Sequence, residues 1–101
     1  MKPAVYRFEF DESVPMAGVS SSMAVALFAA EGLCPAVLIH LGFAYTLDEE
    51  RHCLVADARS WAGQLVTRIF AALLLREFGE TAFRAEPVAG GAPPLQAQVS
   101  P

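Results

Sequence analysis

Residues 36–58, with the sequence AVLIHLGFAYTLDEERHCLVADA, decide the fold that we expect for this chain. From residue 36 to residue 47, large apolar side chains alternate with others along the chain, which is the period of a half-buried β-strand. The most polar run of the sequence, residues 48–51, separates this strand from a second one at residues 52–58. The stretch therefore predicts a β-hairpin.

The length of the hairpin loop sets the register of the two strands. A loop with an even number of residues places Leu54 opposite Tyr45 on the core side of the sheet. A loop with an odd number would turn Asp57 inward, and burying a carboxylate without a partner is costly. We therefore expect the even loop, with Asp57 on the outer face of the sheet as a diagonal neighbour of His40.

A helix is predicted directly after the hairpin. Ser60 is a good N-cap residue, and apolar residues recur at spacings of three and four through residues 61–78. Gly79 stands where many helices end on a left-handed residue, and Arg76 lies in the last turn, where a cation interacts favourably with the helix dipole. Residues 81–86 then alternate as a short last strand.

A strand and a helix are also predicted before the hairpin. Residues 4–10 alternate, with the aromatic side chains on one side. Pro15 suits a first helical turn, and apolar residues then recur at helical spacing up to residue 31. Gly32 and Pro35 end this helix.

The expected order is strand, helix, strand, strand, helix, strand. With right-handed crossovers, this order is an α+β fold of the split βαβ or ferredoxin-like type, in which two helices cover one face of a four-stranded antiparallel sheet. We expect one such domain over residues 1–87, and a flexible Pro/Gly-rich tail over residues 88–101. A fold of this type does not by itself indicate a function.

The composition narrows the class of partner. The chain is 54% hydrophobic and 18% charged, its net charge is −4, and its seven Lys and Arg residues are scattered. Nucleic acids and anionic membranes are bound by clustered positive charge, so we expect neither as a partner. The longest apolar stretch, residues 14–30, is shorter than a membrane span and is interrupted by Gly18 and serines.

The cell compartment is predicted from the same counts. Two cysteines without a CxxC pair favour free thiols in a reducing compartment, and the amino terminus has no signal-peptide pattern, so we expect a cytoplasmic protein. The abundance of Ala, Gly, Arg and Pro with a single Lys indicates a GC-rich, bacterial genome.

No catalytic or metal signature stands out. The side chains of zinc-ligand type lack the paired spacing of structural zinc sites, and we expect no metal and no cofactor. They are Cys34, His40, His52 and Cys53. His40, Asp57 and Ser60 are of catalytic-triad type, but neither a GxSxG pattern nor a glycine-rich oxyanion loop accompanies them. We interpret them as a helix cap and a polar pair, so the sequence does not support an enzyme.

We therefore predict a non-enzymatic module that assembles as a homo-oligomer, or secondarily with another protein. The chain has more apolar residues than a monomer of its size can readily bury, and the expected sheet leaves one face uncovered. The candidate interface residues are Val5, Arg7, Leu38, His40, Val55 and Arg84. The alternative is a small-ligand or regulatory binding domain with an anion-favouring site at the start of the second helix. The candidate ligand-binding residues are Asp57, Ser60 and Trp61.

Overall fold

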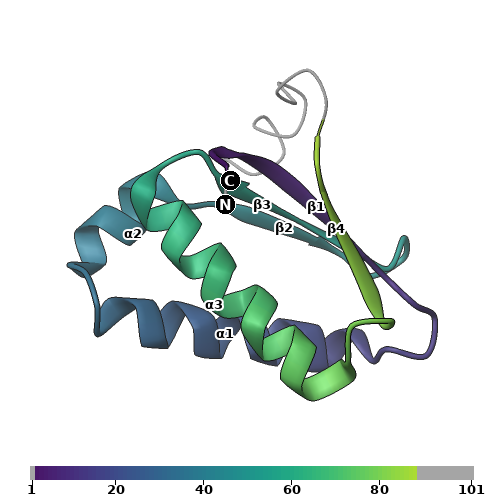
Figure 1. The fold of residues 1–101 in the computed structure, drawn as a ribbon. Coiled ribbons are helices and arrows are strands. Elements are labelled where there is room, and N and C mark those ends of the chain that lie inside the picture. The colour runs from purple at the N-terminus through teal and green to yellow at the C-terminus, as the bar shows by residue number, and fades with distance from the viewer. Residues whose placement is uncertain (1, 89–101) are drawn as a thin grey trace.

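The computed structural model of this protein describes residues 2–88, and these residues form a mixed α+β fold. The elements, in chain order, are β1 (Ala4–Phe10), α1 (Met16–Glu31), α2 (Ala36–Gly42), β2 (Tyr45–Asp48), β3 (Cys53–Ala58), α3 (Trp61–Phe78) and β4 (Phe83–Pro87). The strands form one four-stranded antiparallel sheet in the order β2-β3-β1-β4, and the helices lie on one side of it (Figure 1). The tail expected from residue 88 onward lies outside the described residues apart from Val88.

The long strand expected over residues 36–47 is wrong in its first part. Residues Ala36–Gly42 form the short helix α2, and only Tyr45–Asp48 form strand β2. This segment is apolar at odd and even positions alike, so its alternation in side-chain size does not distinguish a strand from a short helix. Within α2, Ile39 is the buried residue. The structure therefore has a third helix where two were expected.

The hairpin loop has an even number of residues, as expected, but the register of strands β2 and β3 differs from the expected one. Leu47, not Tyr45, lies opposite Leu54. His52 belongs to the loop rather than to the strand, since it adopts the left-handed region with φ of 53°. Its ring Nε2 lies 3.1 Å from the carbonyl oxygen of Val14, which ties the loop to the start of α1. The core-side position of Leu54 is as predicted, because the shift preserves the alternation.

Helix α3 follows the sequence prediction closely. The side chain of Ser60 accepts a hydrogen bond from the amide of Gly63 at 2.9 Å, as expected of an N-cap residue. Gly79 follows the helix with φ of 89°, a conformation that side-chain-bearing residues rarely adopt. Arg76 lies in the last turn.

The hydrophobic core lies between the sheet and helices α1 and α3. Phe8 of β1 and Phe70 of α3 meet edge to face with ring centroids 5.1 Å apart. Met23 of α1 and Leu54 of β3 belong to the same core cluster, and all four side chains are fully buried. The aromatic face of β1 therefore points at the helices, as its alternation predicts.

Thr67 is the weak point of this core. It lies on α3 with no exposed surface, and its hydroxyl oxygen has no hydrogen-bond partner within residues 2–88. We expect Thr67→Val to raise the free energy of unfolding by about 1 kcal/mol, because an isosteric methyl group replaces an unpaired buried hydroxyl. Urea denaturation measures the change. The neighbouring Val66→Thr, the reverse exchange at another fully buried position, should be destabilising, and a Thr67→Val protein no more stable than the parent would contradict the assignment.

Candidate functional site

A pocket lies where α2 meets the first turn of α3. It is an open pocket of about 240 Å³, and it is lined mostly by apolar atoms. Its lining residues are Leu38, Leu41, Gly42, Ser60, Trp61 and Ala62. Two of the three ligand-binding residues predicted from the sequence, Ser60 and Trp61, line this pocket, and Asp57 does not.

Two glycines, Gly42 and Gly63, allow α2, α3 and the end of β3 to lie close together beside the pocket. The Ser60 hydroxyl donates a short hydrogen bond to the carbonyl oxygen of Gly42 at the end of α2, while its oxygen accepts from Gly63. A Cβ on Gly63 would overlap the carbonyl oxygen of Asp57, and a Cβ on Gly42 would lie 2.7 Å from the Ser60 Oγ. Glycine is therefore needed at both positions. The side chain of Ser60 is committed to holding α2 against α3.

Asp57 lies on β3 and is held by its near neighbour. The guanidinium of Arg59 donates to both carboxylate oxygens, at 2.9 and 2.8 Å, and the backbone amide of Arg59 donates to Oδ1 at 3.1 Å. These hydrogen bonds, chiefly that of the Arg59 side chain, hold the pKa of Asp57 below its ordinary value against the opposing effect of burial. The carboxylate thus stabilises the turn from β3 into α3. The predicted pairing of Asp57 with His40 is wrong, because His40 lies on helix α2.

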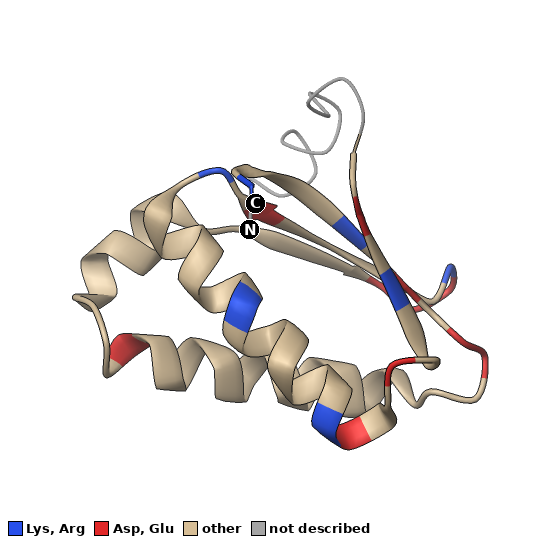
Figure 2. Ribbon diagram, viewed as in Figure 1, with Lys and Arg blue, Asp and Glu red and all other residues tan. Residues whose placement is uncertain are grey.

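The outer face of the sheet carries an ion-pair cluster. Glu9 pairs with Arg7 at 3.1 Å and with Arg84 at 2.8 Å, and Arg84 also lies 3.9 Å from Glu86. Figure 2 shows positively and negatively charged positions on the neighbouring strands β1 and β4. The side chains are partly exposed, which is typical of solvated surface charge.

The apolar side chain of Val5, on the same face, is covered by other residues of the chain. Val5 is only 2% exposed, because Ala44, Val55 and Val88 pack against it. Leu38, which the sequence placed on this sheet face, lies on α2 instead. Of the predicted interface residues, the structure therefore brings Val5, Arg7, Val55 and Arg84 together on the sheet, and places Leu38 and His40 on the helix side.

The helix side exposes large apolar side chains next to the pocket. Leu41 is 82% exposed and Trp61 is 62% exposed. Val37 and Leu38 lie three or four residues from Leu41 along α2, on the same side of the helix, and are also exposed. We call these four residues, Val37, Leu38, Leu41 and Trp61, the α2 patch. The sequence does not indicate Val37 and Leu41 as surface residues, because the alternation of residues 36–47 predicts that both lie on the buried face of a strand.

The α2 patch is free of charged side chains. No Asp, Glu, Lys or Arg occurs between Glu31 and Asp48 in the sequence, and α2 carries no charged residue in Figure 2. Large exposed apolar areas without charge are typical of contact surfaces.

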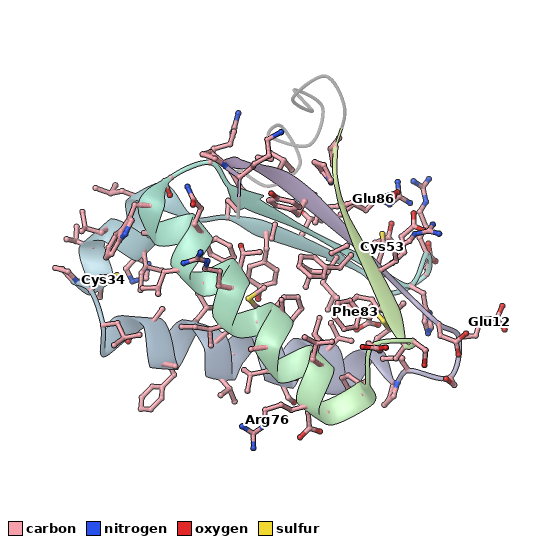
Figure 3. All side chains as sticks on the ribbon, in the orientation of Figure 1. Glu12, Cys34, Cys53, Arg76, Phe83 and Glu86 are labelled. Atoms are coloured by element: carbon pink, nitrogen blue, oxygen red, sulfur yellow. The ribbon has the colours of Figure 1, made fainter. Side chains whose placement is uncertain are left out.

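The cysteines are apart from each other. Cys34 precedes α2 at one end of the molecule and Cys53 lies on β3 at the other end (Figure 3). Both thiols are free and buried, and burial raises the pKa of Cys53. Within residues 2–88, no three His, Cys, Asp or Glu side chains come together in a way that could hold a metal ion.

Comparisons with known proteins match this chain to no protein-family model, no curated protein and no solved structure. Over residues 2–88, no helix combines the length and the apolar character that crossing a bilayer requires. The fold and the site therefore define the protein as a small α+β protein with a four-stranded antiparallel sheet and an exposed, uncharged apolar patch on its helix side.

Proposed function

We propose that this protein is a non-enzymatic assembly module that binds a second copy of itself through the α2 patch. The observation that carries the proposal is the exposure of Leu41 and Trp61 beside an apolar pocket whose lining residues are all uncharged. Burying apolar side chains of this size removes unfavourable contact with water, which is the main driving force of association. Tryptophan is also among the residues that contribute most to binding energy at interfaces.

A two-fold symmetric contact suits this surface. In such a dimer the same patch is used by both copies, so an apolar patch without charge is complementary to itself. A stable interface covers about 800 Å² of each partner, which is about one-eighth of the 5995 Å² surface of the described structure. A contact centred on Leu41 and Trp61 would extend over α2 and the first turn of α3.

The sheet face is less suited to the same role. Arg7 and Arg84 are engaged in ion pairs within the chain, and a partner would have to desolvate these charges. Val5 is covered by its own neighbours. The proposal therefore moves the contact from the sheet residues favoured by the sequence to the helix side, and retains Leu38 as an interface residue.

The alternative function, a small-ligand domain with an anion site at the start of α3, has weaker support. The Ser60 hydroxyl is engaged with Gly42 and Gly63, and the Asp57 carboxylate is engaged with Arg59. The pocket, at about 240 Å³, is smaller than most small-molecule sites.

We further propose that the fold is the split βαβ arrangement with one inserted helix. Its support is the strand order β2-β3-β1-β4 with antiparallel neighbours, and the position of α1 and α3 in the chain. Helix α2 would then be an insertion between α1 and β2. The free cysteines support a cytoplasmic location as part of this proposal.

The test is light scattering after size exclusion over a hundredfold range of concentration. The parent protein should form a dimer, and Leu41→Asp should raise the dimer dissociation constant by at least about tenfold, because a charge would enter an apolar contact. Leu75→Asp is the matched control, since Leu75 is also exposed and lies about 21 Å along α3 from Trp61. A parent protein that is monomeric throughout, or equal weakening by both substitutions, would overturn the proposal.

A further inference from the structure

We propose that the chain's own carboxyl-terminal segment, residues 89–101, binds in the pocket of the α2 patch and competes there with a second copy. The regulatory part of this inference rests on the proposed self-association, and the binding of the segment does not. The segment reads AGGAPPLQAQVSP and carries no charged residue. It is bound through Pro93, Pro94 and Leu95.

The place where the described chain ends supports this occupant. The amide of Val88 donates to the carbonyl oxygen of Val5 at 2.8 Å, Val5 lies opposite Asp57, and the amide of Asp57 donates to Ala44 at 2.9 Å. These four residues form one row across the sheet, and three strand spacings correspond to about 14 Å. Gly42, which lines the pocket, is two residues before Ala44. The chain thus leaves the sheet at the end of the strands where the pocket also lies.

Figure 1 shows the same relation in space. β4 ends on the side of the molecule where the chain passes from β3 into α3, at the top of the view. From Val88 to Pro93 is five residues, which span about 15 Å in a polyproline II conformation at about 3.1 Å per residue. The two residues from Ala44 to Gly42 add about 7 Å roughly at right angles to this row, so Gly42 lies about 16 Å from Val88. Pro93 just spans this distance, and Pro94 and Leu95, at about 19 and 22 Å, exceed it, so the segment reaches the pocket without any rearrangement of the sheet.

The proline-rich, uncharged segment suits the apolar lining of the pocket. Proline-rich segments bind grooves lined by aromatic side chains, because their extended conformation is formed before binding and little entropy is lost. The pocket is lined by the indole of Trp61 and by the aliphatic side chains of Leu38 and Leu41. Since neither side carries a charge, no ion has to be desolvated.

The single tryptophan of the chain makes the binding measurable. The full chain is diluted until light scattering gives the mass of a monomer, and Trp61 emission and quenching by iodide are recorded. Replacing Pro93, Pro94 and Leu95 together by serine should shift the emission to longer wavelength and increase the quenching. Gln96→Ser with Gln98→Ser, in the same segment, is the matched control and should leave both readings unchanged.

A variant of the pocket completes the test. In a Leu41→Asp background, the serine substitutions in the segment should cause no further change in emission, because the pocket no longer holds the segment. Leu41 is 82% exposed, so this substitution does not threaten the fold. Identical emission and quenching in the parent and the segment variant would overturn the proposal.

Measuring the dimer dissociation constant distinguishes a failure of this inference from a failure of the proposed function. If the segment competes with a second copy, its substitution should lower the dimer dissociation constant by about tenfold, because the free patch becomes more populated. A change in Trp61 emission without dimers at any concentration would overturn self-association and retain the bound segment. Dimers whose affinity and emission do not respond to the segment would overturn this inference and retain self-association.

Discussion

Phe70→Ala is expected to lower the free energy of unfolding by about 3–5 kcal/mol, the largest loss from a single substitution that we predict. Phe70 has no exposed surface and lies at the centre of the core, where its ring meets Phe8 at 5.1 Å. The substitution leaves a cavity and removes an edge-to-face pair worth about 0.5–1.5 kcal/mol beyond its buried area. Since the total free energy of unfolding of small domains is about 5–15 kcal/mol, this variant would retain little stability.

Urea denaturation followed by circular dichroism measures this loss. Phe28→Ala is the matched control, because Phe28 lies on α1 with 80% of its surface exposed, and its loss should be within about 0.5 kcal/mol of zero. If the Phe70 substitution cost less than about 1.5 kcal/mol, the packing of α3 against β1 described above would be wrong.

Gly63→Ala should have the second largest effect, a loss of about 3 kcal/mol. The direction of this change is informative, because replacing glycine by alanine within a helix ordinarily raises the free energy of unfolding by up to about 1 kcal/mol. Here the new methyl group would overlap the carbonyl oxygen of Asp57, and it would also lie 3.1 Å from the carbonyl oxygen of Gly42 and the Ser60 Oγ. Two of these neighbours are backbone atoms, on β3 and at the end of α2, so relief requires the first turn of α3 to move away from both elements.

Thermal and urea denaturation of the Gly63→Ala protein test this junction. Gly18→Ala provides the comparison, because its nearest neighbour, at 3.0 Å, is the outer end of the Phe78 ring, which can move aside. The Gly18 variant should change the free energy of unfolding by no more than about 1 kcal/mol. Stabilisation by Gly63→Ala would show that the first turn of α3 does not approach β3 and α2 as the structure has it.

The two stability variants also bear on the proposed contact. Helix α2 carries three residues of the α2 patch, and its hold on the rest of the molecule includes the hydrogen bond from Ser60 to Gly42. A Gly63→Ala protein that still folds should therefore lose self-association as well as stability. By contrast, Thr67→Val acts inside the core and should leave association unchanged.

Part of the candidate site could be predicted from the sequence. The predicted helix start indicates Ser60 and Trp61 as binding residues, and both line the pocket. The same prediction includes Asp57, but the Asp57 carboxylate pairs with Arg59 outside the pocket lining. The other wall of the pocket, including Leu41, was missed because the alternation of residues 36–47 favoured a strand. No local signal placed these residues beside α3.

The sequence by itself determined β1, α1, β3 and α3, because each of these elements buries one continuous face. It also predicted β4, which is mostly exposed and contacts the core through Phe83. In α3, the apolar residues recur at helical spacing between a serine cap and a final glycine, and only one conformation satisfies that pattern. The tertiary structure decided residues 36–42, where a strand and a short helix satisfy the local pattern equally well. What selects the helix is the burial of Ile39 and the hydrogen bond between Gly42 and Ser60, contacts that exist only when α3 is already in place. The same contacts leave Leu41 and Trp61 exposed, and so create the surface on which the proposed function depends.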